Sequence, residues 1–274
     1  MEGTPYFVQL KEALDICFQR PISVGVETLP IDECHGRILA SDLTSKVDDP
    51  PFDNSAMDGF AVRYEDTLSP PTTLKIIGTI QAAGQEDNIE VTKGQAVRIM
   101  TGAPMPKGAD SILQVELTKT EGDNVTLSKE SMRDFIRKKG ENLLKGEVAI
   151  SAGTYLNPSR LGMCATMGYS EIPVFKKLNV AVISTGDELI QPGEELSRGQ
   201  IYESNSFGIS GLVKWLGHNP NRMQCVGDTV DDLREVLDLA SRDNDLIITS
   251  GGVSMGEWDL VRKIMEEEGD LDFW

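Results

Sequence analysis

The N-terminal part of the chain shows apolar residues at a helical spacing. Apolar side chains recur every three or four positions after Pro5, which predicts an amphipathic helix with Pro5 in its first turn and Thr4 as N-cap. We expect one face of this helix to pack against the rest of the protein. The residues of that face are Phe7, Leu10, Leu14 and Cys17.

The pattern changes between residues 52 and 142, where short apolar runs alternate with clusters of Gly, Pro and Asp. Such runs are typical of β-strands, and no long helical pattern interrupts them, so we expect a small β domain. The segment from Pro30 to Thr44 is also expected to be extended. The predicted strands of the β domain are "GFAVRY", "TLKIIGTI", "QAVRIM", "SILQVEL" and "NVTLS".

From Leu178 onward, strand-like and helix-like patterns alternate. The strands are predicted at "NVAVIST", "MQCVGD" and "DLIITS", and helices at residues 204–216, "VDDLREVLDLAS" and "LVRKIMEEEG". This alternation predicts a doubly wound parallel α/β sheet. A short apolar helix, "NPSRLGMCATMG", comes before it.

These patterns predict a multidomain protein of the α/β plus β class. A mixed first domain is formed by residues 1–48 and 143–177, and residues 49–142 are an inserted β domain. Residues 178–274 form an α/β domain. The N-terminal sequence has neither the basic start nor the apolar run of a signal peptide, and no run is long enough for a membrane span, so we expect a cytoplasmic protein.

Charge and composition exclude several classes of function. The 274 residues carry a formal net charge of -18, which argues against general affinity for nucleic acid or an anionic membrane. The four cysteines include no C-x-x-C pair and only two histidines are present, so neither a disulfide framework nor a thiolate zinc site is expected.

Small hydroxyl residues and glycines follow the predicted parallel strands. Ligands of such sheets gather at the carboxyl ends of the strands, where free amides can hold a phosphate and hydroxyls can bond a polar heterocycle. The alternative is ordinary turn and capping chemistry, as for Thr229 with Asp232. The candidate cofactor-binding residues are Ser184, Thr185, Gly186, Ser250, Gly251, Gly252, Ser254 and Gly256.

Three carboxylates, those of Glu188, Asp228 and Asp259, follow the same strands. Two unpartnered charges about 4 Å apart repel by roughly 4 kcal/mol at an effective dielectric near 20, so a cation is expected between them. Hard divalent ions such as Mg²⁺ bind carboxylate oxygens and bridge to phosphates. The three residues therefore predict a metal-assisted phosphate site.

Two segments of the β domain carry further polar chemistry. The stretch "FDNSAMDGFAV" gathers Asp53, Asn54, Ser55 and Asp58, which alone is explained by a turn. Another stretch, "RDFIRKKGENLLKG", carries five basic and two acidic residues. It is either a solvated face or an entrance for an oxyanion.

Six segments together resemble a known family. They are "DNSAMDGFAV", "RIMTGAPMPKGAD", "RKKGEN", "ISTGDEL", "GQIYESNS" and "TSGGVSMGEWD". Their order and spacing are similar to those of the molybdopterin molybdenumtransferases, the bacterial MoeA group to which the E domain of gephyrin also belongs. The resemblance implies an elongated homodimer that inserts molybdate into adenylated molybdopterin and releases AMP. It also implies molybdopterin adenylyltransferase as upstream partner. The identity of the divalent metal, for which Mg²⁺ is the candidate, is left open by the sequence.

The resemblance assigns roles to individual residues. Asp58 and Thr101 match positions implicated in activity, and Glu188, Asp228 and Asp259 match acidic catalytic residues. By the dimeric arrangement, Asp58 would face the α/β domain of the other subunit.

The chain departs from the family pattern in two places. Asn142 stands where the family often has Asp, and the chain stops before a lysine-bearing loop and a C-terminal β domain. We therefore expect a truncated chain that binds ligand weakly and transfers no molybdenum alone. The alternatives are a scaffold of the gephyrin type and a nucleotide-cleaving enzyme that shares only the α/β domain, which "DNSAMDGFAV" disfavours.

Overall fold

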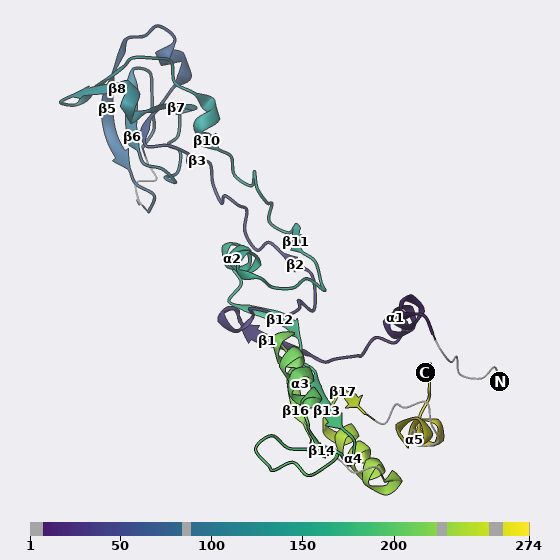
Figure 1. Ribbon diagram of the computed structural model, residues 1–274. Helices are drawn as coiled ribbons and strands as arrows, with labels where there is room; N and C mark the ends of the chain where they lie inside the picture. The colour runs from purple at the N-terminus through teal and green to yellow at the C-terminus, as the bar shows by residue number, and fades with distance from the viewer. Residues whose placement is uncertain (1–7, 84–88, 224–228, 252–259, 274) are drawn as a thin grey trace. The chain divides into compact units, whose positions relative to one another are not determined.

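The computed structural model describes residues 8–83, 89–223, 229–251 and 260–273 (Figure 1). The chain forms two compact units. Unit 1 combines Met1–Thr28 with Pro173–Trp274, and unit 2 is Leu29–Ile172. The finer division into three domains stays a prediction. No helix among the described residues has the length and apolar character needed to cross a bilayer.

Unit 2 contains the predicted β domain as a six-stranded sheet with the order β7-β4-β6-β5-β9-β8. All five predicted strand runs are confirmed, and neighbouring strands are antiparallel except for the parallel pair β5 and β6. The strands are β4 (Gly59–Val62), β5 (Thr72–Ile80), β6 (Gln95–Ile99), β7 (Ser111–Gln114), β8 (Thr118–Glu121) and β9 (Asn124–Leu127).

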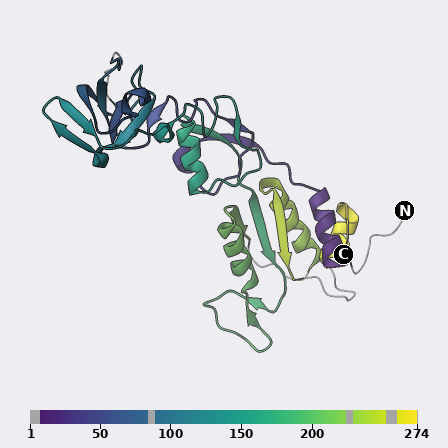
Figure 2. The ribbon, with the colours of Figure 1, turned by 90° about the horizontal axis from the view of Figure 1, so that it is seen from above.

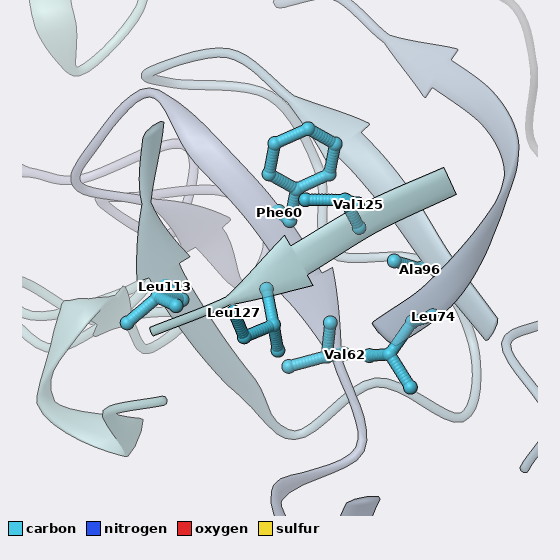
Figure 3. Packing of buried hydrophobic residues seen from close by; sticks show 7 residues of the cluster. All are labelled: Phe60, Val62, Leu74, Ala96, Leu113, Val125 and Leu127. Atoms are coloured by element: carbon cyan, nitrogen blue, oxygen red, sulfur yellow. The ribbon is translucent and has the colours of Figure 1, made fainter. Parts of the chain in front are cut away.

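Strand β4 is buried on both faces, because each face of the sheet carries its own apolar cluster. Phe60 and Val62 point to one face and Ala61 to the other, as the alternation of a strand requires. The first residue of the strand, Gly59, leaves room for β7, because a Cβ there would lie 2.1 Å from the carbonyl oxygen of Leu113. Figure 3 shows the first cluster, formed by Phe60, Val62, Leu74, Ala96, Leu113, Val125 and Leu127.

The rest of unit 2 is built from short pairings and one helix. Helix α2 (Pro158–Thr166) has Pro at its first position and Asn157 as N-cap, whose side chain accepts a hydrogen bond from the backbone N–H of Arg160 at 2.9 Å. The segment predicted to be extended from Pro30 instead includes the 3-10 turn η1 (Ile31–Glu33). The short strands are β2 (Leu43–Thr44) with β11 (Val148–Ile150) and β3 (Asn54–Ser55) with β10 (Ile136–Arg137). Strand β1 (Val26–Pro30) pairs with β12 (Glu171–Phe175), and the boundary between the two units falls within both of these strands.

Unit 1 contains the predicted parallel sheet. Strand β13 (Asn179–Ser184) lies at the centre, between β16 (Asn219–Arg222) and β17 (Leu246–Ser250), and both neighbours run parallel to it. Strand β16 begins earlier than predicted, because the polar run "NPNR" forms this edge strand through backbone pairing and Met223 continues the pairing to Val182. Residues 224–228, the remainder of the predicted strand, lie outside the described residues.

Helices cover both faces of this sheet, which confirms the doubly wound arrangement (Figure 2). Helix α3 (Asn205–Trp215) packs Val213 against Val180 and Val182. Helices α4 (Val230–Asp243) and α5 (Leu260–Glu268) cover the other face, where Ala181 and Ile183 point. A small parallel pair, β14 (Leu189–Ile190) with β15 (Ile201–Tyr202), precedes α3.

The N-terminal helix differs from its prediction. Helix α1 (Leu10–Gln19) begins after Gln9, and the predicted cap and first turn at Thr4 and Pro5 lie outside the described residues. None of its residues is buried, and Leu10 and Phe18 are 75% and 79% exposed, so the predicted packing of its apolar face is wrong within this chain. The apolar spacing continues on both sides of the first residue of α1, so it cannot show where the helix begins. It also does not show what packs against the apolar face of the helix.

Candidate functional site at the ends of the parallel strands

The ends of β13 and β17 lie side by side in unit 1. Ser184 and Ser250 are partners in the parallel register, and the backbone N–H of Thr185 donates to the carbonyl of Ser250 at 3.0 Å. The predicted hydroxyl residues therefore meet at one edge of the sheet. This is the edge where open α/β sheets bind ligands.

Two of these hydroxyl residues differ in what they already bond. The Thr185 hydroxyl is buried and has no hydrogen-bond partner among the described residues, although a buried polar atom normally has one. Ser250 Oγ accepts a hydrogen bond from Asn205 Nδ2 at 2.8 Å, so its own hydrogen remains available to donate. The edge can thus offer hydroxyl donors to a polar ligand.

Gly251 makes the close approach of the two strand ends possible. Its φ is +105°, and a Cβ at this position would lie 2.3 Å from the Thr185 carbonyl oxygen and 2.8 Å from its Oγ1. A side chain would therefore push the loop after β17 away from β13. Gly186, the next predicted residue after Thr185, is also buried.

The carboxylate cluster is described only in part. Glu188 is exposed, and its carboxylate lies close to Gly186, because a Cβ at Gly186 would come 2.5 Å from Glu188 Oε2. Among these residues no group of three His, Cys, Asp or Glu side chains is placed to hold a metal ion. The remaining predicted residues, Asp228, Gly252, Ser254, Gly256 and Asp259, lie outside the described residues.

Glu203 is a buried carboxylate at this edge that the sequence prediction missed. It lies between β15 and α3, and its side chain is only 1% exposed. Its Oε1 accepts hydrogen bonds from Ser184 Oγ at 2.9 Å and from the backbone N–H of Ser206 at 2.7 Å, and its Oε2 accepts one from Ser206 Oγ at 2.7 Å. The available signal was the acidic residue in "GQIYESNS", just before a helix start.

The Glu203 carboxylate is ionised despite its burial. Burial alone would raise the pKa of Glu203, but the hydrogen bonds from Ser206 and Ser184, together with Arg222, outweigh it and lower the pKa below its usual value. Arg222 Nη1 lies 4.0 Å from Glu203 Oε2, and the guanidinium stacks over the Phe207 ring at 3.9 Å from the centroid. The negative charge therefore has a nearby counter-charge.

In unit 2, the structure joins the two site residues predicted from the β domain. Asp58 Oδ1 accepts hydrogen bonds from the backbone N–H of Thr101 at 2.6 Å and from Thr101 Oγ1 at 2.8 Å. These two bonds, with a smaller contribution from Arg98, hold the pKa of Asp58 below its usual value. The antiparallel pairing of β4 with β6 brings the two residues together, since Gly59 pairs with Ile99. Asp58 therefore presents an exposed, ionised carboxylate.

Much of the basic run at residues 133–146 is paired with carboxylates of the same unit. Lys138 Nζ lies 2.8 Å from Asp53 Oδ2, and Lys139 Nζ lies 3.2 Å from Asp48 Oδ2. These contacts favour a structural role over an entrance for oxyanions. Two ion pairs, Arg133 with Asp110 and Lys138 with Asp53, line a cleft of about 340 Å³.

Asn142, the neutral residue in place of the expected acid, donates from Nδ2 to Asp49 Oδ2 at 3.0 Å. An aspartate here would set two carboxylates against each other, which is unfavourable without a cation. The amide therefore suits its neighbour in this chain.

Comparison with known proteins identifies the class and then the family. Residues 181–273 match the family described as a probable molybdopterin binding domain, which agrees with the parallel sheet of unit 1. Residues 8–168 match the MoeA N-terminal region (domain I and II). The chain belongs to the MoeA family.

Individual relatives agree with this assignment. The chain is 38% identical over 258 residues to the molybdopterin molybdenumtransferase of Haemophilus influenzae, and 40% identical over 240 residues to molybdopterin molybdenumtransferase 2 of Mycobacterium tuberculosis. These alignments cover 93% and 86% of this chain but 63% and 59% of the relatives. The chain thus spans about 60% of the length of these relatives.

A solved structure confirms the multidomain fold. The crystal structure of the molybdopterin biosynthesis MoeA protein from Pyrococcus horikoshii matches with a TM-score of 0.82 and 34% identity. The match covers 91% of this chain and 67% of that one.

Proposed function

We propose that this chain acts in molybdenum cofactor biosynthesis, as the part of a molybdopterin molybdenumtransferase that binds adenylated molybdopterin. The full reaction inserts molybdate into this substrate with release of AMP, and we expect the chain alone to bind the substrate without completing the transfer. The observation that carries the proposal is the similarity of about nine-tenths of the chain to proteins with that name. The strand-end edge of unit 1 supports it, because its hydroxyl groups suit a polar, phosphorylated heterocycle.

The described residues would divide the work of ligand binding. Thr185 would bond the ligand through its hydroxyl, which has no hydrogen-bond partner among the residues that the structure describes. Ser250 would donate its own hydroxyl hydrogen, because its oxygen is already the acceptor for Asn205. Gly251 keeps the space between the two strand ends clear of a side chain. The predicted contacts of Gly252, Ser254 and Gly256 complete the proposed binding loop.

Magnesium fits the chemistry of the donors at this edge. Glu188 has an exposed carboxylate, which is the ligand type that Mg²⁺ prefers. We propose that Glu188, Asp228 and Asp259 hold the ion. When bound, Mg²⁺ would supply positive charge between these carboxylates and the phosphate oxygens of the ligand.

Asp58 and Thr101 are proposed as catalytic residues of unit 2. The lowered pKa of Asp58 keeps its carboxylate ionised, so it can accept a hydrogen bond from a donor group of the ligand and orient that group. We further propose a cytoplasmic homodimer in which Asp58 serves the site of the other copy. Molybdopterin adenylyltransferase would supply the adenylated substrate.

Mixing of variant subunits tests the dimer. Copies with Asp58→Ala and copies with Glu188→Ala should each bind adenylated molybdopterin more weakly than the unaltered chain, whereas mixed dimers should regain one unaltered site. Absence of rescue, with mixed dimers shown to form, would count against the shared site.

Ligand binding tests the function itself. We expect the protein to bind adenylated molybdopterin, followed by pterin fluorescence, and to bind it more tightly than AMP. Binding of nucleotides without preference for the pterin would favour a nucleotide-cleaving enzyme. Absence of binding to either ligand would favour a scaffold.

A further inference from the structure

Glu203 makes more contacts than a helix cap needs. The N-cap of α3, Ser204, forms no side-chain capping bond, and Glu203 Oε1 takes over that task by accepting from the backbone N–H of Ser206. The same carboxylate also accepts from Ser184, which is the last residue of β13 and 19 positions earlier in the chain. Glu203 thus ties the start of α3 to the end of the central strand.

Arg222 keeps this tie charge-balanced. A buried carboxylate is costly unless it is paired and hydrogen-bonded, and Glu203 meets both conditions through Arg222 and the two serines. Arg222 is itself held from two sides, by stacking on Phe207 and by a hydrogen bond from its Nη1 to Gln191 Oε1 at 3.3 Å. The guanidinium therefore cannot leave the carboxylate without breaking other contacts.

Ser184, the residue that Glu203 bonds at the end of β13, directly precedes Thr185. Ser184 donates its hydroxyl hydrogen to Glu203, which fixes the rotamer of Ser184. The hydroxyl of Thr185 is buried and has no hydrogen-bond partner among the described residues. Its backbone N–H donates to the carbonyl of Ser250 in β17. A shift of Ser184 would therefore move Thr185 as well.

We propose that Glu203, held by Arg222, is a positioning residue that acts through Ser184 to hold Thr185 in its ligand-binding position. This role rests on the function proposed above and adds residues to its site. A positioning residue differs from a merely structural one in a definite way, because its effect on ligand binding disappears when the residue it acts through is already removed.

A double-mutant cycle on the whole chain tests the role. Glu203→Gln should raise the Kd for adenylated molybdopterin about tenfold, and Ser184→Ala should raise it by a similar factor. The double variant should bind no worse than the weaker single variant. Glu195→Gln is the matched control, because Glu195 is exposed in the loop before β15, and its Kd should equal that of the unaltered protein.

Each outcome decides a different point. If the unaltered protein does not bind, the proposed function fails and this role fails with it. If the unaltered protein binds and Glu203→Gln binds equally well, only the positioning role is overturned. Additive effects in the double variant would also overturn it, since they would show that Glu203 does not act through Ser184.

If circular dichroism shows that Glu203→Gln does not fold, Arg222→Gln provides a second test of the same proposal. This variant keeps the carboxylate and all three serine hydrogen bonds but removes the counter-charge. We expect a several-fold increase in Kd that again disappears in the Ser184→Ala background. An unchanged Kd for a folded Arg222→Gln protein would contradict the proposal.

Discussion

Substitution of Gly251 by alanine probes the strand-end geometry most sharply. The backbone of Gly251 has a φ of +105°, which L residues rarely adopt, and the added Cβ would meet backbone rather than a flexible side chain. Its nearest neighbour would be the Thr185 carbonyl oxygen at 2.3 Å. Neither the carbonyl nor the loop can relieve this contact without moving β13 and β17 apart.

The cost follows from two contributions. Holding a non-glycine residue in such a conformation costs about 1–3 kcal/mol. Separation of the strand ends would also lose the bond from the Thr185 N–H to the Ser250 carbonyl, which is worth about 1 kcal/mol. We therefore expect Gly251→Ala to lower the free energy of unfolding of unit 1 by about 2–4 kcal/mol. At roughly 4 °C per kcal/mol, the Tm should fall by about 8–16 °C.

Thermal unfolding followed by circular dichroism measures this change, with Gly208→Ala as the matched control. Gly208 lies in α3 of the same unit, and a Cβ there would meet no atom within 4 Å. Alanine is the better helix former by about 1 kcal/mol, so this variant should be slightly stabilised. A Gly251→Ala protein as stable as the unaltered chain would refute the close approach of the strand ends.

Three further predictions concern the core and the two carboxylates with lowered pKa values. Phe60→Ala should lower the unfolding free energy of unit 2 by about 3–5 kcal/mol in urea titrations, because Phe60 is 1% exposed in the core of the sheet, and a loss below about 1 kcal/mol would contradict this packing. Glu203 has a lowered pKa in the folded state, so it adds stability above the unfolded-state pKa of about 4.3 that is lost as the pH falls through the folded value. Below about pH 4.3, the unfolding free energy of Glu203→Gln should therefore fall less steeply with decreasing pH than that of the unaltered protein. Equal slopes for the two proteins would argue against the ionised carboxylate. Thr101→Val should raise the pKa of Asp58 in a carboxyl NMR titration by removing the Oγ1 bond, and an unchanged pKa would show that this hydrogen bond does not form in solution.

Local patterns were sufficient to predict most of the elements. The alternation of strands and helices after Leu178 predicts the parallel sheet, and Thr229 caps α4 as expected, since its Oγ1 accepts from the Asp232 N–H at 3.2 Å. The start of α1 was not predictable, because the apolar spacing continues before Leu10 in the sequence, at Phe7. Strand β16 begins earlier than predicted, because polar residues form its pairing through their backbone and show no apolar pattern in the sequence.

The site was less accessible to sequence reasoning than the fold. Thr185 and Ser250 were predicted from their position after strands, which is a local property. Glu203 was missed because its partners Ser184 and Arg222 lie 19 residues away on either side, and only the folded sheet brings them together. The bond between Asp58 and Thr101 likewise spans 43 positions, so the resemblance named both residues without indicating their contact.

Binding of adenylated molybdopterin to this chain tests the central claim most directly. The measurement is a fluorescence titration of the ligand with the unaltered protein and with Thr185→Val. This substitution keeps the side-chain volume and removes the hydroxyl, for which the described part of the chain supplies no partner. We expect saturable binding that Thr185→Val weakens by at least tenfold, in proteins of equal Tm. Equal binding by both proteins would show that the ligand does not use this edge of the sheet, and no binding by a folded, unaltered protein would contradict the proposed function.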